Sequence, residues 1–297
     1  MTVSAAIYGG LRALGVPAAH RLVRDAGVIL CYHNVATASD CALGEPGLHM
    51  PIEHFERQMR WLSRHYRVVS LREFVDRMTR RQSLRRLVAI TFDDGYAGIF
   101  AHAVPVLYAL NLPATVFIVG HAAGSPRPFW WDHPQIVATS TPAQREKWLK
   151  DCRGDGQAIM APLPDSIVPD SHRPAGWPSI CAAISCGIDV GAHSLTHRCL
   201  PELNDVELEE ELAASRHAVR RFTQTTPEFF AYPYGRADAR VSLLVRSLGY
   251  RGGFTLRTGL NDTSSDAWRL ARVNVPAHIS EAAFEAWTAG IGAFWRN

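Results

Sequence analysis

The sequence has no long uninterrupted hydrophobic run and no large excess of charge of either sign. Its most apolar window, residues 101–120, is interrupted by Pro105, Asn111 and Pro113, so we expect no transmembrane span. The net charge of +3 over 297 residues is too weak to favour binding to nucleic acid or to an anionic membrane. With 47% hydrophobic and 20% charged residues, the composition is that of a soluble globular protein with a large core.

Residues 1–14 lack the basic start and the continuous apolar stretch of a secretory signal. We therefore expect a cytoplasmic protein, with peripheral membrane association and export by another route left open. Residues 1–27 are expected to form a helical extension. Its residues Ile7, Leu11 and Leu14, with Arg12, Arg21 and Arg24, are compatible with an amphipathic surface helix, and a helix docked on the body of the protein is the preferred interpretation.

No two cysteines form a C-x-x-C pair, which disfavours a structural zinc cluster and a thioredoxin-like site. A chain of this length buries enough apolar surface to fold without disulfides. We therefore expect reduced thiols at all six positions, which are Cys31, Cys41, Cys152, Cys181, Cys186 and Cys199.

Short apolar runs alternate with helical patterns along much of the chain. Strands alternating with helices predict βα units and a mostly parallel sheet, either open or closed into a barrel. The expected strands cover residues 28–33, 68–69, 87–92, 114–119, 188–192, 228–232 and 272–275.

The clearest helical pattern lies between Asn204 and Phe222. Asn204 is expected to cap this helix, with Glu207 at its third position. Acidic residues fill the first half and basic residues the end, the order that the helix dipole favours. This order indicates that the acidic run is a solvated face and not a binding patch; the run comprises Asp205, Glu207, Glu209, Glu210 and Glu211.

Residues 121–178 break the alternation and predict a loop-rich insertion. The segment holds nine of the 18 prolines and four of the eight tryptophans. An insertion of this length is usually functional, for example as a lid. Its tryptophans either stack as exposed rings on the apolar face of a sugar or pack a small satellite core; they are Trp130, Trp131, Trp148 and Trp177.

Two adjacent carboxylates, Asp93 and Asp94, directly follow the expected buried strand 87–92 in the string TFDDGY. They would repel each other and lose hydration unless a cation or solvent compensates. In a parallel α/β sheet, ligands bind at the carboxyl ends of the strands. The pair is therefore a candidate functional site.

Two histidines, His193 and His197, follow the expected strand 188–192 in the string HSLTH. At this spacing we expect both imidazoles on one side of a helical turn, where they can bind one metal ion. With an aspartate from another strand end they form a two-histidine, one-carboxylate site with open positions. Such a site suits Zn(II), Fe(II), Co(II) or Ni(II) and leaves room for a water nucleophile.

A third string, FFAYPYG at 229–235, runs from an expected strand into a rigid turn. The backbone N–H groups of such a turn can face a pocket and bind a tetrahedral oxyanion. A turn that only packs against its neighbours is the alternative interpretation.

Taken in this order, TFDDG at 91–95, HSLTH at 193–197 and YPYG at 232–235 resemble the motifs of the polysaccharide deacetylase family. This family has the NodB-homology domain and forms carbohydrate esterase family four. The resemblance covers roughly residues 28–275. It implies an α/β fold, a distorted (β/α) barrel with the loop-rich insertion, as one domain over residues 28–297. It also implies hydrolysis of an N-acetyl or O-acetyl group on a carbohydrate with one divalent metal ion, zinc being the first expectation.

The resemblance assigns a role to each matching residue. Asp93 is implied to be the general base that takes a proton from the attacking water. Asp94, His193 and His197 are implied to hold the metal ion, and the backbone N–H of Tyr234 to stabilise the oxyanion. The implied partner is an acetylated saccharide.

Two departures from the family pattern concern the residues around the base. Many members have an arginine that orients the base in an Arg-x-Pro-Tyr stretch, and this chain has Ala231 there. Another residue must then orient the base, and the candidates are Arg236, Arg269 and Arg272.

The family's late Leu-x-His motif, whose histidine protonates the leaving amine, is not clearly present. The string CYHNV at 31–35 instead resembles the Tyr-His-x-Val string of the exopolysaccharide branch, where the acid histidine comes from the N-terminal strand. We therefore expect His33 to be the general acid, with His278 as the second choice. A core histidine bonded to the backbone is the alternative for His33. The string FWWD at 129–132 also resembles an element of that branch, in which the insertion flanks the substrate groove.

These observations favour a metal-dependent deacetylase of an N-acetylated sugar in a polysaccharide or glycan precursor. The first alternative is an amidase or imidase with a non-sugar substrate, because the same site hydrolyses other amides. The second is a carbohydrate-binding relic that has lost turnover, which Ala231 and the missing late motif would suggest.

Overall fold

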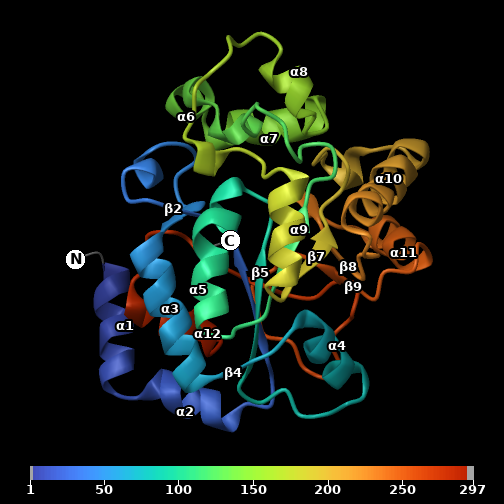
Figure 1. Ribbon diagram of the computed structural model, residues 1–297. Coiled ribbons are helices and arrows are strands. Elements are labelled where there is room, and N and C mark those ends of the chain that lie inside the picture. The colour runs from blue at the N-terminus through green and yellow to red at the C-terminus, as the bar shows by residue number, and fades with distance from the viewer. Residues whose placement is uncertain (1–2, 293–297) are drawn as a thin grey trace.

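The computed structural model describes residues 3–292, and its centre is a curved sheet of eight parallel strands with helices around it (Figure 1). The strand order is β10-β1-β5-β6-β7-β8-β9. The short strand β4 pairs with the first residues of β5, on the edge opposite β1. The strands are β1 (Val28–Tyr32), β4 (Arg67–Val68), β5 (Leu87–Phe92), β6 (Ala114–Ile118), β7 (Ile188–Ala192), β8 (Phe229–Ala231), β9 (Gly252–Phe254) and β10 (Val273–Asn274).

The central strands form where the sequence is continuously apolar. Every residue of β1 and of β5 is buried, because helices cover the outer face and the barrel core fills the inner face. These two strands pair in parallel from Val28 opposite Val88 to Tyr32 opposite Phe92. The predicted α/β barrel class is confirmed.

The barrel is incompletely closed. The outermost strands β9 and β10 form no ladder with each other among the described residues, and an isolated parallel bridge joins Phe254 to Leu270. Strand β9 was not among the expected strands, because its sequence GGF carries no run of β-formers.

The helix expected between Asn204 and Phe222 is α10, at Asp205–Thr223. Asn204 caps α10 and forms the expected capping box with Glu207. The helices outside the insertion are α1 (Val3–Ala13), α2 (Val16–Val23), α3 (Ile52–His65), α4 (Leu71–Thr79), α5 (Val104–Ala109), α9 (Trp177–Ser185), α10 (Asp205–Thr223), α11 (Ala239–Ser247) and α12 (Glu281–Thr288).

The N-terminal helices α1 and α2 pack on the barrel beside α12 (Figure 1). The hydroxyl of Tyr8 donates to the carbonyl of Gly292 at 2.9 Å and accepts from Trp287 Nε1 at 2.9 Å. Residues 1 and 2 of the expected helical extension, and residues 293–297 of the expected domain, lie outside the described residues. Within residues 3–292, no helix is long and apolar enough to cross a membrane.

The insertion between β6 and β7 lies over the end of the barrel where the strands finish (Figure 1). It contains three short helices and two single 3₁₀ turns. They are η3 (Trp130–Asp132), α6 (Pro134–Thr139), α7 (Pro142–Asp151), α8 (Gly156–Met160) and η4 (Asp170–His172).

A buried polar cluster fastens this insertion to the barrel. Asp132 Oδ2 accepts a hydrogen bond from the Tyr96 hydroxyl at 2.6 Å. Its other oxygen lies 2.9 Å from His49 Nε2 and accepts from the backbone amide of Glu45 at 2.7 Å. The Tyr96 hydroxyl in turn accepts from Trp131 Nε1 at 2.7 Å. The carboxylate therefore joins the insertion to the loop after β5 and to the segment before β3 (His49–Pro51).

His172 makes this cluster sensitive to acid. Its ring is buried and stacks on His49 with centroids 3.7 Å apart, and neither ring nitrogen has a partner among the described residues. Burial, and then the neighbouring His49, lower the pKa of His172 from 6.5 to about 4, while Asp132 and Asp40 oppose the shift.

We expect acid to destabilise the protein through His172. Between pH 6.5 and 4 the unfolded chain binds a proton at this residue and the folded protein does not, so stability falls as the pH falls. The loss should be at most about 3 kcal/mol, measured by urea unfolding at several pH values. His172→Phe should flatten this dependence, and His217→Phe, at an exposed histidine, should not. Equal slopes in the wild type and His172→Phe would contradict the expectation.

Candidate active site

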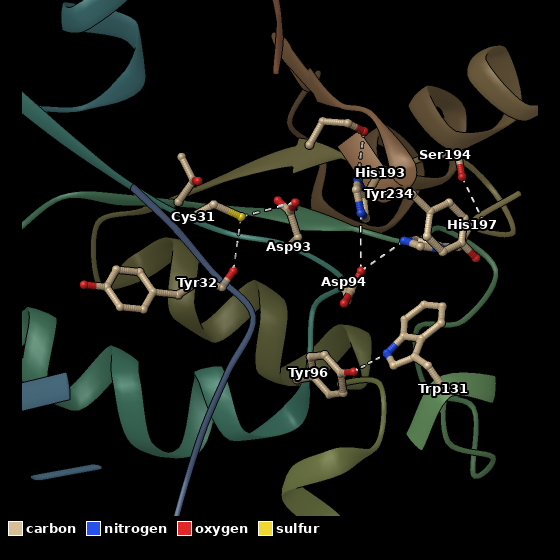
Figure 2. Close-up of polar contacts among 12 residues, drawn as sticks. Cys31, Tyr32, Asp93, Asp94, Tyr96, Trp131, His193, Ser194, His197 and Tyr234 are labelled. Atoms are coloured by element: carbon tan, nitrogen blue, oxygen red, sulfur yellow. Dashed lines mark hydrogen bonds and ion pairs between the residues drawn. The ribbon is translucent and has the colours of Figure 1, made fainter. Parts of the chain in front are cut away.

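Three side chains from two strand ends converge into one buried cluster (Figure 2). Asp94 follows β5, and His193 and His197 follow β7. Asp94 Oδ1 lies 3.3 Å from His193 Nε2 and 3.2 Å from His197 Nε2. All three side chains are buried, and they form a group that can hold a metal ion. The structure thus brings together the three residues that the sequence predicts as ligands.

The two histidines do not lie on a helical turn, so that expectation is wrong. Residues 193–197 form an irregular loop in which Ser194 and His197 have left-handed backbones, with φ of 59° and 61°. Ser194 Oγ accepts a hydrogen bond from the His197 amide at 2.9 Å. This tight loop, and not helical spacing, points both imidazoles at Asp94. Such conformations are costly for residues other than glycine and are concentrated at functional sites.

The donor set fits a divalent metal ion. His193 Nδ1 lies 2.8 Å from the carbonyl of Ala231, which can only accept, so Nδ1 carries the proton. In the neutral ring, Nε2 then presents a lone pair to Asp94 Oδ1, which is also an acceptor. Either a proton on Nε2 or a metal ion between the two atoms satisfies both acceptors, and two imidazoles with one carboxylate match the preferences of Zn(II) and similar ions.

The charges around Asp94 keep its carboxyl group ionised. Burial opposes ionisation, but hydrogen bonds with His193 and His197 hold the pKa of Asp94 well below its usual range. An ionised carboxylate is the form that binds metal.

Arg272 forms a bidentate ion pair with Asp93. Its Nη1 and Nη2 atoms donate to the two carboxylate oxygens at 2.7 and 2.6 Å, and Nε donates to the carbonyl of Thr255 at 3.0 Å. The arginine is completely buried, and it immediately precedes β10. Burial opposes ionisation of Asp93, but the Arg272 guanidinium lowers the pKa of Asp93 overall.

Of the three arginines considered as substitutes for the one missing at Ala231, Arg272 is the one that contacts Asp93. Arg236 instead pairs with Glu146 on α7, and Arg269 is exposed and reaches the carbonyl of Ala237. Sequence spacing gave no reason to choose among them, because Arg272 and Asp93 are 179 residues apart.

His33 lies beside Asp93 at the carboxyl end of β1. Cys31, His33 and Asp93 each have one potential metal-ligating atom, and these three atoms lie within 4.8 Å of one another. A metal ion in this second group would meet the Arg272 cation that Asp93 already binds, so the group around Asp94 is the better metal site. Burial lowers the pKa of His33.

His278 belongs to neither of these two groups. Its side chain is exposed and is next to Gly47. The structure thus places His33, and not His278, beside the two aspartates.

The turn after β8 packs against the candidate metal ligands. Tyr234 has a left-handed backbone, with φ of 58°, inside the 3₁₀ turn η6 (Pro233–Gly235). Its ring packs edge-on against His197, with centroids 4.6 Å apart. Trp130 Nε1 donates to the Tyr234 hydroxyl at 3.1 Å, so the insertion holds this turn in place.

The insertion supplies one wall of a cleft of about 580 Å³ beside His197. Trp130 and Trp131 line it but are only 5% and 6% exposed, and Trp131 stacks on Phe129 at 4.8 Å. These two rings therefore pack into the hydrophobic core of the barrel and not into a separate satellite core, and the interpretation that they stack as exposed rings on a sugar is wrong for them. The edge of Trp131 still contacts His197, with centroids 4.6 Å apart.

The acidic run of α10 is not entirely a solvated face. Glu209 and Glu210 are exposed as expected, but Glu211 is 4% exposed and turns inward. Its carboxylate accepts from the amides of Leu195 and Thr196, both at 2.9 Å. Helical periodicity was the signal available here, because Glu211 shares its face with the buried Leu208 and Leu212 and not with Glu210.

Known proteins share both the sequence and this architecture. The family description "Polysaccharide deacetylase" matches residues 80–253, more than half of the chain. A poly-β-1,6-N-acetyl-D-glucosamine N-deacetylase of Staphylococcus epidermidis is 34% identical over 236 residues, which cover 79% of this chain and 71% of that protein. The chain belongs to the polysaccharide deacetylase family.

Two solved structures share the fold. The structure of IcaB from Ammonifex degensii superposes with a TM-score of 0.65 at 20% identity, over 90% of this chain and 98% of that one. A Streptococcus pyogenes deacetylase, PplD, solved in complex with acetate, has a TM-score of 0.64 at 16% identity over 87% and 96% of the two chains. Together with the staphylococcal relative, IcaB supports the exopolysaccharide-associated branch of the family.

Proposed function

We propose that this protein is a metal-dependent hydrolase that removes acetyl groups from N-acetylated sugars of a polysaccharide or glycan precursor. The observation that carries the proposal is that two buried charged groups lie side by side at the carboxyl end of β5. One is the Asp94–His193–His197 cluster, and the other is the Asp93–Arg272 ion pair beside it. The staphylococcal relative, named for an N-acetylglucosamine polymer, supports the sugar class.

In this proposal Asp94, His193 and His197 hold the metal ion. When bound, a divalent metal ion polarises the acetyl carbonyl and lowers the pKa of a bound water. Asp93 acts as general base, and the two hydrogen bonds from Arg272 keep its carboxylate ionised and fix its orientation.

Two further groups complete the proposed site. His33, beside Asp93, donates a proton to the leaving amine; burial lowers the pKa of His33, and the carboxylates of Asp94 and Asp93 oppose that shift and favour the protonated ring. The backbone N–H of Tyr234, in the turn that packs on His197, stabilises the oxyanion.

Two other functions were weighed against this one. An amidase or imidase with a non-sugar substrate would use the same ligands and base. A binding relic is disfavoured because buried Asp93, Asp94 and Arg272 cost stability that an unused site has no reason to retain.

The proposal predicts acetate release from β-1,6-linked N-acetylglucosamine oligomers by protein loaded with Zn(II) or Co(II). The His193→Ala variant should lose both the metal ion and the activity, because it lacks the imidazole that is one of the three proposed ligands. Metal content is measured by elemental analysis and acetate by a coupled assay, with small imides and lipid-linked saccharides as competing substrates. Full activity in metal-free His193→Ala would reject the proposed chemistry, and turnover of imides alone would reject the sugar substrate.

A further inference from the structure

Glu211 is a buried carboxylate in α10 that contacts the loop between the two histidine ligands. Its Oε2 atom accepts hydrogen bonds from the backbone amides of Leu195 and Thr196, each at 2.9 Å. Its Oε1 atom accepts from the hydroxyl of Thr196. All three donors belong to the three-residue segment, 194–196, that separates His193 from His197.

No basic side chain neutralises this carboxylate. Within residues 3–292, no lysine, arginine or histidine lies at ion-pair distance from Glu211, although Glu207, one turn earlier, pairs with Arg153 and Arg198. A buried, unpaired carboxylate costs several kcal/mol unless its oxygens are satisfied. The loop amides donate hydrogen bonds to the carboxylate and reduce this cost, so the carboxylate and the loop stabilise each other.

The loop needs such support because its backbone is strained. Ser194 and His197 both have left-handed backbones, each of which costs about 1–2 kcal/mol for a residue other than glycine. Successive amides beside a left-handed residue form a concave site that prefers an anion. The carboxylate of Glu211 occupies this site between Leu195 and Thr196.

We propose that Glu211 is a positioning residue for the metal centre. It holds the loop in the conformation that points His193 Nε2 and His197 Nε2 at Asp94 Oδ1. Its negative charge, which no basic residue cancels, also offsets part of the charge of the bound ion. This inference rests on the proposed function only in requiring that the cluster binds a metal ion.

The test compares Glu211→Gln with Glu210→Gln. Glutamine keeps the size of the side chain, but it has one acceptor oxygen in place of two and no charge. Glu210 adjoins Glu211, lines the same cleft and is exposed, so its variant matches the change in net charge. We expect Glu211→Gln to bind Zn(II) about 10–100-fold more weakly than the wild type, and Glu210→Gln to bind it equally well. Affinity is measured by competition with a chromophoric chelator, without substrate.

A second measurement separates positioning from general stabilisation. Urea unfolding is recorded for each protein with and without Zn(II), and positioning predicts a smaller stabilisation by Zn(II) in Glu211→Gln. Thr196→Val, which removes only the hydroxyl donor, should weaken Zn(II) binding by a smaller factor and serves if Glu211→Gln does not fold.

Wild-type Zn(II) affinity in both Glu211→Gln and Thr196→Val would overturn this inference, even if both variants unfold more easily. Failure of the wild type itself to bind any divalent metal would overturn the proposed function as well. The two failures are therefore distinguishable.

Discussion

Asp93→Asn is expected to reduce acetate release by about 10²–10⁴-fold while the metal ion stays bound. Asparagine has nearly the same shape as aspartate but cannot accept a proton from the attacking water. The three residues that hold the metal ion in the proposed site, Asp94, His193 and His197, are unchanged in this variant. The loss should therefore fall on kcat, with metal content near that of the wild type.

The measurement combines acetate release with elemental analysis of the same preparations. Asp189→Asn is the matched control, because Asp189 is an exposed aspartate on β7 outside the cluster, and it should keep wild-type activity. Full activity of Asp93→Asn would show that Asp93 is not the base. Loss of metal from Asp93→Asn would show that Asp93 belongs to the metal site.

Arg272→Met is expected to lower the free energy of unfolding by about 3–5 kcal/mol. The guanidinium is completely buried and makes two hydrogen bonds with Asp93, so its removal leaves a buried carboxylate without a counter-charge. Methionine fills much of the same volume, so the lost pairing and not a cavity dominates the effect.

A double-mutant cycle isolates the pair. Asp93→Asn/Arg272→Met removes both charges and should regain much of the stability lost in Arg272→Met, as measured by urea unfolding. Arg272→Lys tests whether the bidentate geometry matters beyond the positive charge. Because one ammonium group cannot make the two parallel hydrogen bonds, this variant should be less active than the wild type. Additive stability losses in the cycle would show that the two side chains do not act as a pair.

Arg272 supplies the contact with Asp93 that the family pattern would assign to an arginine at position 231. The missing arginine belongs at Ala231, at the end of β8, and Arg272 reaches Asp93 from the other edge of the sheet, beside β1. The two outermost strands, β9 and β10, approach each other in the incompletely closed barrel. Phe254 in β9 forms a bridge with Leu270, two residues before Arg272.

The parts of the fold that the sequence predicted are those with strong local signals. The apolar run at 87–92 became β5 at those bounds, because a strand buried on both faces needs apolar residues nearly throughout. Residues 188–192 became β7 at the predicted bounds, although the exposed Asp189 interrupts the apolar pattern. The capping box at Asn204 set the start of α10. Strand β9, with two glycines, had no such signal and forms because β8 offers it a partner.

The sequence by itself determined the chemistry of the candidate ligands. Asp94, His193 and His197 follow strand ends, and parallel strands carry their ends to one edge, so their convergence follows from order and spacing. Local pattern was sufficient here because each motif lies directly after its strand.

Only the tertiary structure decided what surrounds those ligands. It selected Arg272 among three arginines, turned Glu211 inward, buried Trp130 and gave the 193–197 loop its left-handed turns. Each of these outcomes depends on contacts between segments far apart in the chain or on the balance between burial cost and compensating hydrogen bonds. Neither quantity is visible in a local sequence pattern, because both depend on which side chains meet after the barrel has formed.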